Sequence, residues 1–261
     1  MTADPLTVVK IGGSTLGQHD TSLDDVATLF AEGRRFVVVH GGGATITEWL
    51  AIHNVESRFV RGLRVTDERA LDVVVAVLAG VVNKRLVAEL EARGAPAVGR
   101  SGADGAVIRA RRYDPELGFV GQVVSVDGEA LRAAARDAIV VLAPIAIEVE
   151  GQTPRPQLLN VNADTAAGEI AVGIGAQQLI FLTDVPGVMD GSGAVRSELS
   201  ANQTRELLDN GVVAGGMIPK VEAALHAAAS GVPAHIVDGR RAGALRDVIA
   251  GQQAAGGTRI V

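Results

Sequence analysis

The sequence contains no cysteine and few aromatic residues. Without cysteine, the chain cannot form disulfides, use a thiolate nucleophile or bind a metal through sulfur. Aromatic residues make up only 3% of the chain, whereas apolar residues as a whole make up 48%. The core must therefore be built from Val, Leu, Ile and Ala. Short Val-rich runs between Ala-rich stretches are typical of alternating buried strands and helices.

The sequence also lacks an excess of positive charge and a long apolar run. The net charge of -6 argues against a nucleic-acid-binding protein, which would present a basic face. The longest apolar run, Val73 to Val82, is far shorter than the roughly 20 residues that span a bilayer. The first residues, MTADPLTVVK, lead into an expected strand without the pattern of a signal peptide. We expect a soluble, cytoplasmic protein with no membrane or nucleic-acid partner.

Several well-known catalytic patterns are missing. The sequence has no G-x-x-x-x-G-K-[ST] pattern, which excludes a P-loop ATPase, and no G-x-G-x-x-G after the first strand, which argues against a nicotinamide enzyme. Its histidines are scattered, without metal-ligand spacing or a serine–histidine–aspartate arrangement. The chemistry must therefore come from other residue types.

Two glycine turns follow expected strands near the N-terminus. The apolar run Leu6 to Ile11 ends at Gly12 and Gly13, and the run Phe36 to Val39 leads into three glycines at 41–43. A helical pattern lies between the runs, which completes a parallel strand–helix–strand unit. Both turns then lie at the carboxyl edge of the sheet, where ligands bind. Backbone N–H groups of such turns form a cradle for an anion, although a tight turn alone also explains the glycines.

Charged and amide side chains stand at several expected element ends. Lys10 lies near the end of an apolar strand, where it either reaches solvent or meets an anion. Asn160, Asn162 and Asp164 cluster at the start of a helix, where helix capping is the alternative explanation. Lys220 follows a Gly-Gly loop in the first turn of a helix, with Pro219 at the first helical position. The helix dipole disfavours a cation there, which indicates an anion site, although an exposed lysine that tolerates a small unfavourable dipole energy is the alternative explanation.

Two further segments suggest binding roles. Ser57 to Thr66 carries three arginines, at positions 58, 61 and 64, which form either a carboxylate clamp or an exposed hairpin. The next helix should start with a cap at residues 66–68 and end at about Arg93, with Gly94 as its stop. Its middle is apolar nearly all round, which favours burial in a homodimer interface near residues 67–93.

The remaining pattern predicts an α/β protein, a three-layer α-β-α sandwich around a mainly parallel open sheet. A break near Gln177 separates an N-terminal lobe, residues 1–176, from a C-terminal lobe, residues 177–261, within one continuous domain. Further helices are expected at 22–33, 45–54 (with Thr45 and Glu48 as a capping box), 127–135, 165–174, 200–208 (with Ser200 and Gln203 as a capping box), 219–230 and 242–249. Further strands are expected at 106–109, 119–124, 139–143, 145–150 beside the preceding strand, 178–183, 234–237 and 258–261, with a loop at 151–156.

The collected residues suit phosphoryl transfer. Such a reaction needs positioning and neutralisation of charge on the moving group, which lysines and backbone N–H groups supply. No general base stands out in the sequence. A carboxylate acceptor is already ionised at pH 7 and needs no base, so the pattern favours formation of an acyl phosphate.

The ordered motifs resemble the amino acid kinase family, and within it the N-acetylglutamate kinases. The resemblance covers nearly the whole chain and is carried by VVKIGGS (8–14), VVHGGG (38–43), GLRVT (62–66), LAGVVNK (78–84), NVNAD (160–164), LTDVPGV (182–188), GGMIPKVEAA (215–224) and GTRIV (257–261). It implies ATP-dependent phosphorylation of the side-chain carboxylate of N-acetyl-L-glutamate, a step of arginine biosynthesis, with Mg²⁺ entering on ATP and no metal ligands from the protein.

The resemblance also implies roles for matching residues. Lys10 and Lys220 would neutralise the moving phosphoryl group, and Asp164 would hold both lysines. Substrate-binding residues would be Gly42, Gly43, Arg64, Asn160 and Asn162. The nucleotide would be bound by Gly12, Gly13, Asp184, Val185, Gly187, Val188, Met189, Val212, Val213, Ala214 and Gly216.

Two other functions and one other assembly are consistent with these motifs. A sister kinase acts on carrier-protein-bound α-aminoadipate or glutamate and shares the lysines and glycines, and an inactive nucleotide or amino-acid sensor would keep the fold alone. Arginine-inhibited hexamers of the family carry an additional N-terminal helix, whereas five residues precede the first expected strand here. We therefore expect a homodimer without arginine feedback.

Overall fold

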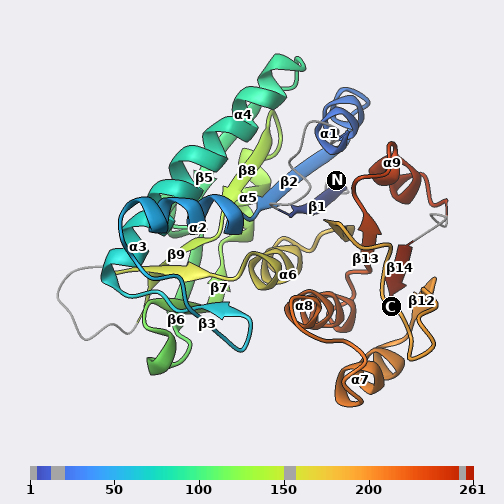
Figure 1. The fold of residues 1–261 in the computed structure, drawn as a ribbon. Helices are drawn as coiled ribbons and strands as arrows, with labels where there is room; N and C mark the ends of the chain where they lie inside the picture. The colour runs from blue at the N-terminus through green and yellow to red at the C-terminus, as the bar shows by residue number, and fades with distance from the viewer. Residues whose placement is uncertain (1–4, 13–20, 150–156, 253–256) are drawn as a thin grey trace.

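The central element is one eight-stranded, mainly parallel sheet. The structure, a computed structural model, describes residues 5–12, 21–149, 157–252 and 257–261. The strand order is β12-β14-β13-β11-β1-β2-β8-β5 (Figure 1). In that order the strands span Glu198–Leu199, Gly257–Ile260, Ala234–Asp238, Gln178–Thr183, Leu6–Ile11, Arg35–His40, Ile139–Ala143 and Ala97–Ser101. Strands from β13 to β5 run parallel, and β14 and β12 run in the opposite direction.

Both faces of this sheet are buried. Alternate residues of a strand point to opposite faces, so Val8 and Val9 of β1 belong to two different core clusters. One face is covered by α1 (Ser22–Ala31), α2 (Gly43–Ile52), α3 (Glu68–Val75), α4 (Asn83–Ala92) and α9 (Ala244–Ile249). The other is covered by α5 (Gly128–Ala134), α6 (Ala163–Gly173), α7 (Ala201–Asp209) and α8 (Met217–Ala229) (Figure 1). The expected three-layer sandwich is confirmed.

A second, smaller sheet lies outside the main one and was not expected. It closes on itself in the order β10-β7-β6-β9, with bounds Leu158–Val161, Val120–Val126, Ile108–Arg112 and Ile145–Glu148. The expectation that the segment from Ile145 pairs beside β8 is wrong, because Pro144 follows β8 and β9 pairs with β10 and β6 instead. Asn160 at the end of β10 is thereby placed next to Val120 of β7.

The long helix after residue 67 is a single rod with a π-helical middle. Asp67 caps it by accepting a hydrogen bond from the Ala70 N–H, and α3 continues through the π segment Ala76–Val82 into α4. The middle of this helix, residues 73–82, is apolar, and in the single chain only one side of it is buried. Val74, Val77, Leu78 and Val82 are buried, whereas Asp72, Ala76 and Gly80 are exposed on the other side. Among the described residues, no helix is both long and apolar enough to cross a membrane.

Several element ends differ from the sequence prediction. Helix α2 begins at Gly43 with Gly42 as its N-cap residue, so Thr45 and Glu48 do not form the expected capping box. Pro219 is the third residue of α8 rather than the first. The capping box of α7, Ser200 with Gln203, is confirmed. Strands β5, β10 and β12 were not predicted, since they are short or only partly buried. The 151–156 loop lies outside the described residues.

Candidate functional site

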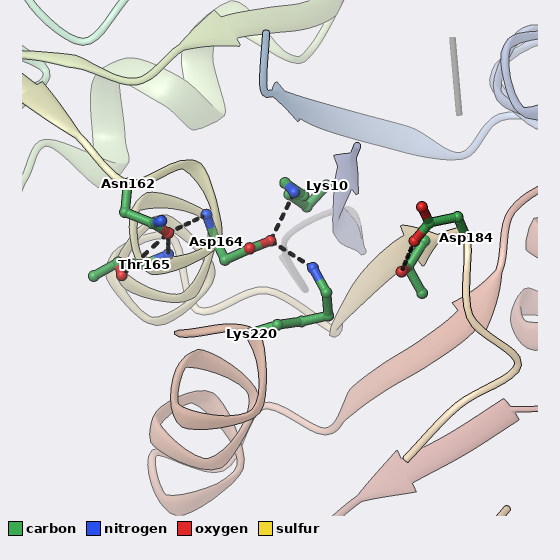
Figure 2. Close-up of polar contacts among 7 residues, drawn as sticks. Lys10, Asn162, Asp164, Thr165, Asp184 and Lys220 are labelled. Carbon is green, nitrogen blue, oxygen red and sulfur yellow. Dashed lines mark hydrogen bonds and ion pairs between the residues drawn. The ribbon is translucent and has the colours of Figure 1, made fainter. Parts of the chain in front are cut away.

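Two lysines share one carboxylate oxygen at the carboxyl edge of the sheet. Lys10 Nζ lies 2.8 Å and Lys220 Nζ 2.9 Å from Oδ1 of Asp164. Figure 2 shows both ammonium groups pointing at this carboxylate from different elements, β1 and α8. All three side chains are almost entirely buried. The three predicted residues therefore form one cluster with a net charge of +1.

The alternation of β1 explains why Lys10 faces this cluster. Even-numbered residues of β1, such as Val8, point to the face covered by α6 and α8, and Lys10 continues that series near the strand end. Residue 10 therefore does not reach solvent, which was the alternative open from the sequence. Its neighbours in the sheet are Val39 of β2 and Phe181 of β11.

The packing of α6 on α8 brings Asp164 and Lys220 together. A Cβ atom at Gly168 would lie 3.1 Å from the Cβ atom of Ala223, so the two helices touch about one turn beyond Asp164 and Lys220. Asn162 caps α6 by accepting hydrogen bonds from the Asp164 and Thr165 N–H groups, at 2.9 and 3.1 Å (Figure 2). The capping role left open for Asn162 is thus real, and it fixes the start of the helix that carries Asp164.

The charges of the cluster shift two pKa values. Burial opposes ionisation of Asp164, but the charges and hydrogen bonds of Lys10 and Lys220 outweigh it and lower the pKa of this carboxyl. Burial and the charge of Lys10 lower the pKa of Lys220, although Asp164 acts in the opposite direction. The Lys220 ammonium also lies 5.2 Å from the centroid of the buried Phe181 ring. The cluster therefore holds an ionised carboxylate with a positive surplus, which suits an incoming anion.

A pocket of about 170 Å³ opens between α2, the start of α6 and the hairpin of β3 (Phe59–Val60) and β4 (Leu63–Arg64). Five residues predicted to bind substrate line it together: Gly42, Gly43, Arg64, Asn160 and Asn162. Apolar side chains such as Ile46, Leu63 and Val120 complete its wall. The pocket thus combines a cation, amides and backbone N–H groups with an apolar surface.

Arg64 is the one arginine of its hairpin that turns inward. The hairpin consists of β3 (Phe59–Val60) and β4 (Leu63–Arg64), whereas Arg58 and Arg61 are exposed. The Arg64 guanidinium donates to Ser57 Oγ, to the Gly43 carbonyl and to Thr47 Oγ1, and it lies 4.6 Å from the Phe59 ring centroid. The sequence prediction selected Arg64 but missed Ser57 and Thr47, since no local pattern marks them.

A buried histidine supports the glycine loop at residues 41–43. His40 is fully buried, and its Nδ1 lies 3.0 Å from the Gly41 carbonyl, while its Nε2 lies 3.2 Å from Asn83 Nδ2. Because a carbonyl and an amide NH₂ group face the ring, Nδ1 carries the proton and Nε2 accepts. Burial lowers the pKa of His40 to about 4, so the ring stays neutral at physiological pH.

Gly42 has no room for a side chain, because the long helix packs against it. A Cβ atom there would lie 2.8 Å from Leu78 Cδ2 and 3.3 Å from Val82 Cγ2, both in the π segment. At Gly43 a Cβ atom would meet nothing within 4 Å. The long helix therefore presses directly against the middle glycine of the loop.

Only some of the residues predicted to bind nucleotide have exposed side chains. Asp184, Met189, Val212, Ala214 and Gly216 are exposed at the end of β11 and around the start of α8, and Val185 is half-buried. Gly187 is buried, and the side chains of Val188 and Val213 belong to the main core. The Gly12 N–H donates to the Leu182 carbonyl at 3.3 Å, so it already has a backbone partner. Gly13 lies outside the described residues.

Comparison with known proteins places this geometry in one family. The sequence profile described as the amino acid kinase family matches residues 5–238, which is most of the chain. The chain belongs to the amino acid kinase family. Within the family, the acetylglutamate kinase of Dehalococcoides mccartyi (strain ATCC BAA-2100 / JCM 16839 / KCTC 5957 / BAV1) is 45% identical over 241 residues, covering 90% of this chain and 88% of the relative. The acetylglutamate kinase of Solibacter usitatus (strain Ellin6076) is 43% identical over 258 residues, covering 97% and 98%.

Solved structures of the amino acid kinase fold agree with the architecture. A protein of Streptococcus mutans UA159, smu.665, superposes with a TM-score of 0.79 at 31% identity, over 89% of this chain and 94% of that chain. The N-acetylglutamate synthase of Neisseria gonorrhoeae, complexed with coenzyme A and N-acetyl-glutamate, gives 0.82 at 26% identity and covers 99% of this chain and 59% of that chain. The carbamate kinase of Giardia lamblia bound to AMP-PNP, at 16% identity and a TM-score of 0.72, shares the fold.

Proposed function

We propose that this chain transfers the γ-phosphoryl group of ATP to the side-chain carboxylate of N-acetyl-L-glutamate, giving N-acetyl-L-glutamyl 5-phosphate in arginine biosynthesis. The observation that carries the proposal is the convergence of Lys10 and Lys220 on Asp164, in a chain 43–45% identical to acetylglutamate kinases. A pocket with an inward-facing arginine and two amide side chains lies at the start of the helix that carries Asp164. Such a pocket suits a short N-acylated dicarboxylic acid.

The step itself needs no proton transfer. One oxygen of the substrate carboxylate attacks the γ-phosphorus, the bond to the bridging oxygen of ADP breaks, and ADP leaves with that electron pair. Lys10 and Lys220 neutralise the charge on the transferring group, and Asp164 keeps both ammonium groups at the same point. Backbone N–H groups of residues 42 and 43 and the N-terminus of α6 add positive potential toward the acid. Arg64 and Asn160 hold the substrate's carboxylate and acetamido groups.

The nucleotide is assigned to the C-terminal lobe, with its base and ribose beside residues 184–189 and 212–216. Because Val188 and Val213 are core residues, only their backbone groups can contribute there. The substrate residues precede Gln177, in keeping with two lobes that share one sheet. The proposed site of action is the cytoplasm, where ATP and biosynthetic intermediates are available.

A divalent cation fits this site as part of the nucleotide. Among the described residues, no three His, Cys, Asp or Glu side chains gather closely enough to hold a metal. Mg²⁺ usually keeps several waters and binds through substrate phosphates and one or two carboxylates. The exposed Asp184, whose charge acts on Lys220, is the carboxylate that could approach it. The cation would neutralise charge on the phosphates of ATP.

A trapping assay distinguishes this function from its alternatives. Purified protein with ATP, Mg²⁺ and hydroxylamine should convert N-acetyl-L-glutamate into its acyl hydroxamate, with free L-glutamate and a carrier-bound α-aminoadipate as competing acids. Turnover on the carrier-bound acid alone would reject the proposal in favour of the sister kinase, which the similarity to acetylglutamate kinases does not favour. Turnover on none of the acids would leave a nucleotide or amino-acid sensor.

The chain is also proposed to form a homodimer through the helix near residues 67–93. On its outer side Ala76 is exposed, and a hollow lined by Trp49, Val55, Val73 and other residues lies beside it. Ile52, at the end of neighbouring helix α2, is 70% exposed. Light scattering should give a dimer for the wild type and for Ala133→Glu on α5, and a monomer for Ala76→Glu. A monomeric wild type at micromolar concentration would contradict this interface.

A further inference from the structure

Thr66 connects the two sides of the substrate pocket although it does not line it. The residue is fully buried between β4 and α3. Its Oγ1 lies 2.9 Å from the Arg64 carbonyl and 3.1 Å from Nδ2 of Asn160, which are separated from each other by almost a hundred positions in the sequence. One hydroxyl group therefore contacts both residues that are proposed to hold the acid.

The chemistry of these partners fixes the direction of each hydrogen bond. A backbone carbonyl can only accept, so the single hydroxyl proton of Thr66 is donated to Arg64. The hydroxyl then has only lone pairs left for Asn160, and the atom that faces it must be the NH₂ group. The amide of Asn160 consequently cannot be flipped without breaking this bond, and its oxygen is turned away from Thr66.

The oxygen of Asn160 is thereby left for a ligand. Asn160 lines the pocket, and within the described part of the chain no donor contacts its Oδ1. An acceptor oxygen at a half-buried site gains a hydrogen bond only from a ligand that offers an N–H or O–H group. We propose that Thr66 is a positioning residue that holds the Asn160 amide in one orientation. The pocket thereby selects acids that carry an N–H group on the α-carbon. This inference rests on the proposed function, since N-acetyl-L-glutamate carries such an N–H.

The backbone around Thr66 is held independently of the hydroxyl. The Thr66 N–H donates to the Leu117 carbonyl at 3.0 Å, and the Thr66 carbonyl accepts from the Phe119 N–H at 2.7 Å. The Phe119 carbonyl in turn accepts from the Asn160 N–H at 2.9 Å. Removing the hydroxyl therefore leaves these backbone hydrogen bonds in place, releases the Asn160 amide and takes one donor from the Arg64 carbonyl. The Arg64 guanidinium keeps its own partners, Ser57 and Thr47.

The test compares two variants on two substrates that differ in one group. The substrates are N-acetyl-L-glutamate and its ester analogue, (S)-2-acetoxyglutarate, in which an oxygen replaces the N–H. The variants are Thr66→Val, which keeps the shape without the hydroxyl, and Thr66→Ser, which restores it. For the wild type we expect kcat/KM to favour the amide about tenfold or more, the size of one hydrogen bond.

In Thr66→Val this preference should disappear, because KM for the amide rises while KM for the ester and kcat for both change less than about threefold. Thr66→Ser should recover the preference. Equal losses on both substrates in Thr66→Val would overturn the inference and leave Thr66 a purely structural role. If Thr66→Val does not melt cooperatively, the test rests on the wild type and Thr66→Ser. A wild type with equal kcat/KM for the amide and the ester would also overturn the inference. Failure of the wild type on both substrates would instead reject the proposed function.

Discussion

Lys220 Nζ lies 2.9 Å from Oδ1 of Asp164, and the two residues come from the first turns of two helices that pack side by side. A lysine near a helix N-terminus is disfavoured by the dipole, and burial makes it more so. Lys220 is nevertheless held there because Asp164 supplies a negative charge, and Lys10 contacts the same carboxylate oxygen. Because two ammonium groups meet one carboxylate, the cluster is buried and positively charged, which suits an incoming phosphoryl group.

Removing either lysine should abolish most of the activity. Lys10→Met and Lys220→Met are each expected to lower kcat by about a hundredfold or more, since one lost electrostatic contact to developing charge costs about 2.7–4 kcal/mol. Steady-state kinetics with saturating ATP and acid measure this. Arg136→Met removes one positive charge from the exposed surface and should leave kcat unchanged. Near-normal kcat in both lysine variants would show that the cluster has no catalytic role.

Asp164 should make the protein more stable above pH 4 than below it. Its folded-state pKa is lower than the ordinary value of 3.8, so its contribution is fully present above that value and is lost as the pH falls through the lowered pKa. Asp164→Asn leaves two buried lysines unpaired and should cost about 3–5 kcal/mol near pH 7.

Denaturant unfolding of the wild type and Asp164→Asn between about pH 2.5 and 7 should show this difference in stability shrink below about pH 4. Asp209→Asn, which changes an exposed carboxylate, provides the control and should follow the wild type. A difference that stays constant down to the lowest pH would mean that the carboxyl of Asp164 is not held ionised by the lysines.

Gly42 and Gly43 should respond differently to the same substitution. Gly42→Ala forces Leu78 and Val82 to move, and overpacking of this kind costs about 1–3 kcal/mol, so the melting temperature and the activity should both fall. Gly43→Ala meets no atom within 4 Å and should melt like the wild type. Thermal melting beside kinetics checks both variants. Equal melting temperatures of Gly42→Ala and the wild type would mean that Leu78 and Val82 of the π segment move aside without cost.

Arg64→Ala should act mainly on binding of the acid. The loss of a charged, bidentate donor is expected to raise KM for the acid tenfold or more, at about 1.4 kcal/mol per factor of ten, with little change in KM for ATP. The exposed Arg58→Ala serves as a matched control from the same segment. If both arginine variants raised KM equally, the segment would attract the acid by general charge rather than through Arg64.

Much of the fold could be predicted because the central strands are apolar, end at polar, glycine or proline turns and are separated by helical patterns. β1, β2, β8, β11 and β13 follow that pattern. The small barrel could not be predicted, because β10 and β9 have four residues each and their partners depend on long-range contacts. The π segment was also missed, since it keeps the composition of an ordinary helix.

The site was only partly visible in the sequence. Lys10, Asp164 and Lys220 could be selected because a charge at the end of an apolar strand or the start of a helix is unusual. Their meeting at a single oxygen depends on the packing of α6 and α8, which no local pattern encodes. The sequence marked Thr66 only as part of a helix start, and its role at the pocket could not be predicted, since it depends on two contacts that only the folded chain forms.

The most direct measurement follows an oxygen isotope from the acid to phosphate. N-acetyl-L-glutamate labelled with ¹⁸O in its side-chain carboxylate is incubated with the protein, ATP, Mg²⁺ and hydroxylamine, and the released inorganic phosphate is examined by ³¹P NMR. If the carboxylate attacks the γ-phosphorus, hydroxylamine then displaces phosphate from the acyl carbon, and each phosphate carries one ¹⁸O atom from the substrate. Phosphate without the label, or unlabelled phosphate formed equally without the acid, would show that water is the acceptor and would contradict the account.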